Sequence, residues 1–74
     1  MLISIRDHKG KLMVKDILDI DFDMYVESVN NKFIIRINHQ YRLDEEFDSE
    51  RAAEDRMLQI AGTRNKLEED LAQY

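Results

Sequence analysis

The stretch that decides the fold runs from Leu18 to Tyr41 and reads LDIDFDMYVESVNNKFIIRINHQY. Apolar side chains take every second position on both sides of an Asn30-Asn31 pair. These positions hold Leu18, Ile20, Phe22, Met24, Val26, Phe33, Ile35, Ile37 and Tyr41. A period of two is typical of β-strands, because successive side chains point to opposite faces of a sheet. The stretch therefore predicts a β-hairpin with one apolar face and one acidic face.

The turn sets the register of this hairpin. Asparagine tolerates the left-handed backbone conformation that a two-residue hairpin turn requires, so a turn at Asn30-Asn31 pairs Val29 with Lys32. Counting back gives the pairs on the apolar face: Val26 with Ile35, Met24 with Ile37, Phe22 with His39, and Ile20 with Tyr41. The pairs on the other face are Tyr25 with Arg36, Asp23 with Asn38, and Asp19 with Arg42. A shift of one residue would expose an apolar row, so both faces agree on this register.

Two further strands are predicted before this hairpin. Residues 1–7 alternate as a strand does, and a tight turn follows in which Gly10 supplies the positive φ. Residues 12–14 begin a second strand, which a bend or bulge at Lys15-Asp16 interrupts. The alternative is one long, bent strand over residues 12–26.

From residue 48 the apolar positions are spaced by alternate steps of four and three, which is typical of an amphipathic helix. The stripe comprises Ala53, Met57, Ile60, Arg64, Leu67 and Leu71. Asp48 or Ser49 is the expected N-cap, because its side-chain oxygen can accept a hydrogen bond from a backbone N–H of the first turn. The pattern predicts a helix over residues 48–73.

Together these elements predict an α+β fold, in which an antiparallel β-meander of about four strands carries one long C-terminal helix packed on its apolar face. The 74 residues allow a single domain, divided into the sheet (residues 1–43) and the helix (residues 48–73). A chain of this length buries only about 60% of its unfolded surface, so oligomerisation is an obvious further source of stability.

Composition limits the classes of function. The net charge of −5 disfavours attraction to DNA, RNA and anionic lipid. Hydrophobic residues make up 43% of the chain, which argues against disorder. No apolar run approaches the ~20 residues of a membrane span, and the N-terminus lacks the apolar segment of a signal peptide. The sequence has no cysteine, which suits a reducing compartment, so a cytoplasmic protein is expected.

The sequence shows no pattern typical of catalysis, cofactor binding or metal binding. Ser4, Ser28 and Ser49 have no accompanying base in a recognisable arrangement. His8 falls in a turn, and His39 falls on the apolar face, where a hydrogen-bonded residue of the core or its rim is expected. Zinc sites would need more ligands than two separated histidines supply. We therefore expect a protein that is not an enzyme.

Four acidic side chains share one face of the predicted hairpin and form the candidate partner-binding site: Asp19, Asp21, Asp23 and Glu27. Carboxylates spaced about 7 Å apart along a strand do not converge on a cation as a hard-metal site requires. An exposed acidic strip repels phosphate backbones and attracts lysine- and arginine-rich protein surfaces. A solvated face that is partly neutralised by salt bridges is the alternative interpretation.

Arg64 interrupts the apolar stripe of the predicted helix, and two explanations stay open. Its aliphatic part could cover neighbouring apolar side chains while the guanidinium reaches solvent. Alternatively, the helix extends beyond its own sheet and its second half packs on another copy of the chain, giving a homodimer. The candidate self-association surface comprises Ile60, Arg64, Leu67 and Leu71.

The junction Glu46-Phe47-Asp48-Ser49-Glu50-Arg51-Ala52-Ala53 resembles a pattern in many short uncharacterised bacterial proteins. In that pattern, an acidic–aromatic pair after a strand-rich half is followed by Ser or Thr, acids, and a helix with small inward residues. Such chains are associated with Gram-positive genomes, including prophages and conjugative elements. The resemblance covers the last strand and the first helical turns, and it implies a sheet-plus-helix fold without implying an activity.

These observations favour a small, acidic, non-enzymatic protein-interaction module. Its expected partner is a protein with a basic patch, and neither nucleic acid nor a membrane is expected to bind. The alternative is an acidic inhibitor or nucleic-acid mimic that acts on a basic host or phage protein. A mimic should bind a basic nucleic-acid-binding protein with a steep salt dependence, whereas an interaction module need not.

Overall fold

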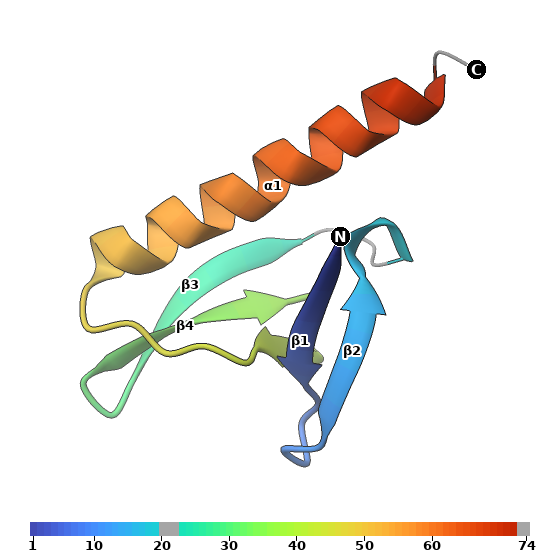
Figure 1. Cartoon of the computed structure of the whole chain (residues 1–74). Coiled ribbons are helices and arrows are strands. Elements are labelled where there is room, and N and C mark those ends of the chain that lie inside the picture. The colour runs from blue at the N-terminus through green and yellow to red at the C-terminus, as the bar shows by residue number, and fades with distance from the viewer. Residues whose placement is uncertain (20–22, 73–74) are drawn as a thin grey trace.

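The computed structural model describes residues 1–19 and 23–72, and over these residues the chain forms an antiparallel sheet and one α-helix (Figure 1). The elements are β1 (Leu2–Arg6), β2 (Leu12–Asp16), the 3₁₀ helix η1 (Ile17–Asp19), β3 (Met24–Val29), β4 (Lys32–Ile37), β5 (Tyr41–Leu43) and α1 (Glu50–Ala72). The α+β class is thereby confirmed. The sheet has five strands, where the sequence predicts about four.

Two local units make up the sheet. β1 and β2 form an N-terminal hairpin, and β3, β4 and β5 form a meander, so the strand order is β2-β1-β5-β4-β3. The units join between β1 and β5, where Ile5 lies opposite Leu43 and Arg6 lies opposite Arg42. Over the described residues, β2 and β3 are therefore the two edges of the sheet.

The predicted register of the central hairpin is confirmed. Met24 lies opposite Ile37, and Val29 lies opposite Lys32. The turn residues Asn30 and Asn31 have φ values of 51° and 64°, in the left-handed region that asparagine tolerates. The same strands also pair Tyr25 with Arg36 and Val26 with Ile35. The predicted partners Ile20 and Phe22 lie outside the described residues.

A second left-handed turn ends β4 earlier than the alternation predicts. Asn38 and His39 have φ values of 55° and 61°, and the chain reverses so that Tyr41 lies opposite Ile37 in β5. Tyr41 therefore lies in a separate strand between β4 and β1 and does not continue β4. The predicted position of His39 on the apolar face is wrong for the same reason, because His39 lies in this turn.

The alternation is also broken between β2 and β3. Residues Ile17–Asp19 form η1, and the backbone N–H of Leu18 donates to Oδ1 of Asp16 (3.0 Å). The predicted strand from Leu18 is therefore wrong over its first residues, and the predicted pairing of Asp19 with Arg42 is wrong as well. Ile17 is completely buried in η1. This explains why its apolar side chain is out of phase with the alternation of the strands.

The core draws on both the sheet and the helix. Its buried members are Ile3, Ile5, Ile17, Ile35, Ile37, Leu43, Ala53 and Ile60. Ala53 and Ile60 are two helical turns apart and therefore point to the same side of α1. Ser49 is the N-cap, since its Oγ accepts a hydrogen bond from the backbone N–H of Ala52 (3.1 Å). The 23 residues of α1 give a helix about 34 Å long.

Replacing Ile60 with alanine should lower the free energy of unfolding by about 2–5 kcal/mol, because a fully buried side chain is lost and a cavity remains. Urea denaturation measures this change. Leu58→Ala is a matched control on the same helix, since Leu58 is 65% exposed and should contribute less than about 0.5 kcal/mol. Equal losses in the two variants would contradict the position of Ile60 in the core.

The turn at Asn30-Asn31 can be tested with one pair of substitutions. Asn31→Ala should cost about 1 kcal/mol of stability, because an alanine is strained at a φ of 64°. Asn31→Gly should keep the stability of the parent chain, since glycine adopts positive φ without strain. Thermal unfolding of both variants gives the comparison. A glycine variant as unstable as the alanine variant would show that the asparagine side chain, and not the backbone conformation, matters here.

Candidate functional site

The structure does not bring the predicted acidic residues together on one strand face. Asp19 belongs to η1, Asp23 lies directly before β3, and Glu27 lies within β3, while Asp21 lies outside the described residues. Asp19 and Asp23 are exposed, whereas Glu27 is partly buried. The prediction that all four share a strand face is wrong for Asp19, because η1 interrupts the alternation before β3. Their role in binding a partner stays a prediction.

Three arginines lie side by side across the sheet. Arg42 of β5 stands opposite both Arg6 of β1 and Arg36 of β4. These positions alternate along their strands with buried core residues such as Ile5 and Leu43, so the arginines point to the other face. We call Arg6, Arg42 and Arg36 the arginine row. The face that the sequence predicts as acidic thus has basic side chains at its centre.

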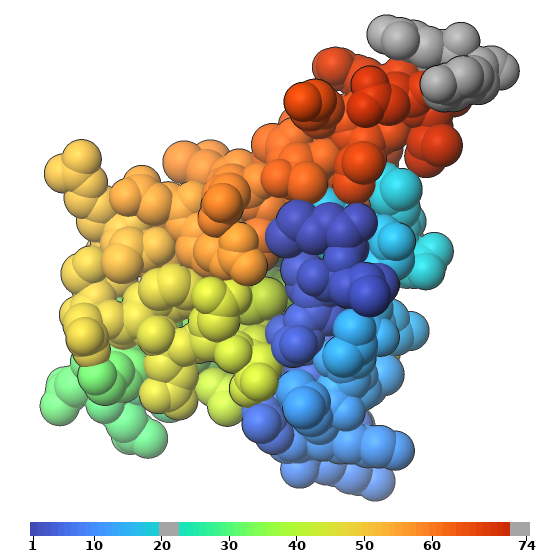
Figure 2. Space-filling view, in the orientation of Figure 1, coloured from blue at the N-terminus to red at the C-terminus, as the bar shows by residue number. Residues whose placement is uncertain are grey.

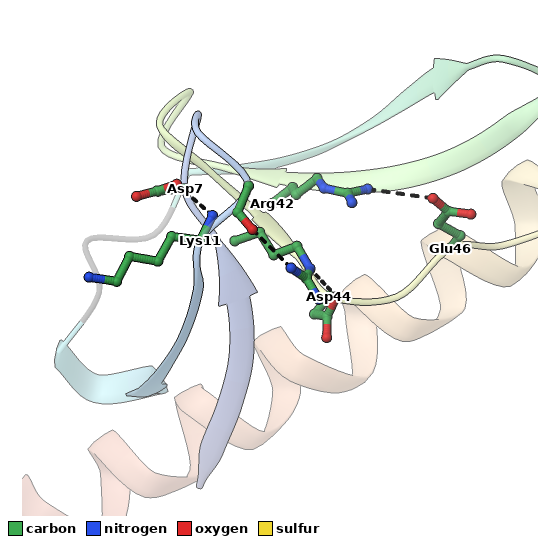
Figure 3. A network of polar contacts seen from close by, with 7 residues as sticks. Asp7, Lys11, Arg42, Asp44 and Glu46 are labelled. Carbon is green, nitrogen blue, oxygen red and sulfur yellow. Dashed lines mark hydrogen bonds and ion pairs between the residues drawn. The ribbon is translucent and has the colours of Figure 1, made fainter.

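Carboxylates neutralise the arginine row. Like charges directly opposite one another on neighbouring strands destabilise a sheet, so each arginine needs an acidic neighbour. The ion pairs are Arg6 Nε with Asp44 Oδ1 (2.6 Å), Arg36 Nε with Glu27 Oε2 (3.2 Å), and Arg42 Nη1 with Glu46 Oε1 (3.7 Å). Figure 3 shows Asp44 and Glu46 reaching this network from the segment after β5. Glu27 is therefore engaged within the chain.

Asp7 organises the turn between β1 and β2. Its Oδ1 accepts hydrogen bonds from the backbone N–H groups of Lys9 and Lys11, both at 2.9 Å. Figure 3 shows the contact with Lys11. The N–H of Lys11, with a smaller effect from that of Lys9, lowers the pKa of Asp7 below its ordinary value of 3.8. Gly10 completes the turn with a φ of 81°.

His39 contacts Tyr25 of β3 and Asp23, which lies directly before that strand. Its Nδ1 lies 3.2 Å from the hydroxyl of Tyr25, and the two rings are 5.2 Å apart between centroids. Its Nε2 lies 3.7 Å from Oδ2 of Asp23. The His39 side chain is 72% exposed, so it is a hydrogen-bonded surface residue of the turn.

The four residues of the candidate self-association surface lie in different surroundings. Ile60 is fully buried within the chain's own core, and Leu67 packs partly against that core. Arg64 donates from Nε to the carbonyl oxygen of Ile17 (3.3 Å) and pairs through Nη1 with Glu68 (3.2 Å). Leu71 is 63% exposed near the end of α1, where the helix projects beyond the sheet (Figures 1 and 2). Self-association stays a prediction.

A groove that sequence reasoning missed runs between β3 and α1. It consists of two adjoining hollows of about 340 and 430 Å³, which share Met24, Met57 and Leu58. The first hollow also has Ala61, Arg64 and Asn65 in its lining, and the second has Tyr25, Val26, Glu50 and Glu54. We call this the β3–α1 groove. In the sequence, Leu58 could have indicated this groove, because it is a large apolar residue that lies beside the apolar stripe of the helix and not on it.

Two acidic side chains of the helix border the second hollow. Glu50 and Glu54 are one turn apart on α1, and both are exposed. Within the described part of the chain, no ion pair involves either of them. The groove therefore combines an apolar lining with uncompensated negative charge at one end.

Two properties of the described residues bear on the kind of site present. No group of three or more His, Asp or Glu side chains is placed so that it could hold a metal ion. No helix is both long enough and apolar enough to cross a membrane. Apolar side chains line both hollows of the groove.

The hydrogen bonds to Asp7 predict a pH dependence of stability. The folded chain lowers the pKa of Asp7, so the ionised carboxylate stabilises the fold at pH values above the ordinary pKa of 3.8. This stabilisation is lost as the pH falls through the lower pKa of the folded chain. Asp7→Asn keeps an acceptor oxygen without the charge. The difference in urea midpoint between the parent chain and Asp7→Asn should therefore be present at neutral pH and shrink below about pH 4. A difference that is constant with pH would contradict this account.

Comparison with known proteins finds no relative of this chain. No family model matches the sequence, and no curated protein and no solved structure is similar to it. The groove, its charges and the adjoining edge strand β3 are therefore the features from which a function can be inferred.

Proposed function

We propose that this chain is a non-enzymatic, cytoplasmic protein-interaction module that binds a protein partner with a basic patch. The observation that carries the proposal is the β3–α1 groove, whose apolar lining is bordered by the exposed carboxylates of Glu50 and Glu54. An apolar hollow with a charged rim is typical of surfaces that bind other proteins, because apolar contacts supply affinity while the charges select the partner.

The exposed leucine of the helix supports a binding role for this groove. Leu58 is 65% exposed and lines both hollows, together with the partly buried Met24 and Met57. Methionine side chains adapt their shape to a bound surface, which makes them common at protein-binding sites. Contact with a partner would remove this apolar surface from water.

The charges around the groove support a basic partner. Asp23, which directly precedes Met24 of β3, is 70% exposed and adds a carboxylate to those of Glu50 and Glu54 on α1. The chain as a whole has a net charge of −5. A surface of this sign attracts lysine- and arginine-rich proteins and repels nucleic-acid phosphates.

Affinity capture from the source cells tests the proposal. The parent chain should retain a basic protein at about 50 mM salt and lose it progressively toward about 500 mM, because salt screens exposed charges. Glu50→Gln together with Glu54→Gln should weaken binding of that protein by about three- to tenfold. Random-sequence duplex DNA should not bind.

The matched control removes the same charge elsewhere on the helix. Glu69 and Asp70 are exposed near the C-terminal end of α1, so Glu69→Gln with Asp70→Asn should leave binding unchanged. Equal weakening by the two double variants would mean that net charge, and not the groove, attracts the partner. Displacement of the captured protein by duplex DNA would instead identify the chain as a nucleic-acid mimic. Retention of no basic protein would refute the proposal.

A further inference from the structure

We propose that the partner binds by strand addition: an extended segment pairs with the free edge of β3 and lays apolar side chains at alternate positions into the β3–α1 groove, with a lysine or arginine beside Glu50 and Glu54. This inference rests on the proposed function and names the binding mode and the chemistry of the bound segment. Such a segment would form a further strand of the sheet at the edge next to α1.

The backbone of β3 is arranged for such pairing. The N–H of Asn38 donates to the carbonyl oxygen of Asp23 (2.8 Å), so the alternate residues from Asp23 onward direct their backbone groups to β4. The backbone N–H and C=O groups of Met24, Val26 and Ser28 therefore point away from β4, along the outer edge. Over the described residues, β4 is the strand that pairs with β3, and the outer edge has none.

The groove matches the side-chain spacing of an added strand. Met24 and Val26 point to the helix side of the sheet, where both pack partly against the core. Side chains of an added strand that lie opposite them would point to the same side. Residues two apart on a strand are separated by about 7 Å, and the two hollows adjoin one another along β3. Each hollow can therefore take one of two alternate apolar side chains.

The other edge of the sheet is less suited to strand addition. Lys11 lies directly before β2 and Lys15 lies near its end, and lysines at an edge disfavour pairing with another strand. β3 has no lysine among its six residues, MYVESV. The groove beside β3 also offers side-chain contacts in addition to backbone hydrogen bonds, and these contacts supply specificity.

Charge complementarity selects the occupant. Pairing two copies of this chain edge to edge at β3 would bring together the carboxylates of Asp23, Glu50 and Glu54 from both copies, which repel one another. A segment of another protein with a lysine or arginine next to its second apolar residue would instead meet Glu50 and Glu54 at the second hollow. We therefore assign the groove to a basic, extended segment of a different protein.

The probe for this proposal is a capped peptide of about seven residues in which two valines alternate with threonines and a lysine stands at each end, long enough to pair with all of β3. Titrated into isotope-labelled protein, it should shift the amide resonances of Met24, Val26 and Ser28 and slow their hydrogen exchange. A peptide with N-methyl groups on the amides that would face β3 should bind at least about tenfold more weakly. Replacing both lysines with glutamates should also weaken binding.

Leu58→Ser tests the groove with the fold intact, because Leu58 is exposed. It should weaken peptide binding by about tenfold, whereas Leu71→Ser, at the equally exposed position near the end of α1, should not. No binding at about 1 mM peptide, shifts confined to β2, or equal binding of the N-methylated peptide would each overturn strand addition.

The two proposals fail separately. If the peptide fails while capture of a basic protein still depends on Glu50 and Glu54, the interaction module stands and strand addition is wrong. If the peptide pairs with β3 but no basic protein is captured in a charge-dependent way, the basic partner is wrong while the edge site stands.

Discussion

Burial of an isoleucine cluster between the sheet and the helix is the constraint on which the rest of this small fold depends. Ile5 lies in β1, Ile35 and Ile37 lie in β4, and all three share a cluster with Ala53 and Ile60 of α1. With 74 residues, the chain has little further material with which to cover its sheet. Among the described residues, no further helix or strand covers the arginine face of the sheet or pairs with the outer edge of β3, although Ile34 is buried on that face.

Ion pairs between the arginine row and its carboxylates stabilise the sheet face opposite the core. The arginine row would be unfavourable alone, since three like charges stand on adjacent strands. Asp44 and Glu46, from the segment between β5 and α1, supply two of the neutralising carboxylates. This connection therefore links the sheet to the helix and also balances the face opposite the core. Over the described residues, no strand pairs with the outer edge of β3.

The sequence predicts local pairing well and non-local pairing poorly. The Asn30-Asn31 turn and the alternation on both sides determine the register of β3 and β4, because turn and pattern are neighbours in the chain. The turn at Asn38 and His39 escapes prediction because Tyr41 keeps the apolar parity of the preceding strand. The arginine row and the groove depend on which strands and helix become neighbours in space, and alternation within one segment carries no information about that choice.

The join between β1 and β5 has a consequence for the order of folding. The hairpin β1–β2 and the meander β3–β4–β5 each pair segments that are close in the chain, so their closure costs little conformational entropy. The pairing of Ile5 with Leu43 instead closes a loop that spans more than half of the chain. Formation of this long-range contact is expected to limit the folding rate, with two preformed local units docking along a single pair of strands.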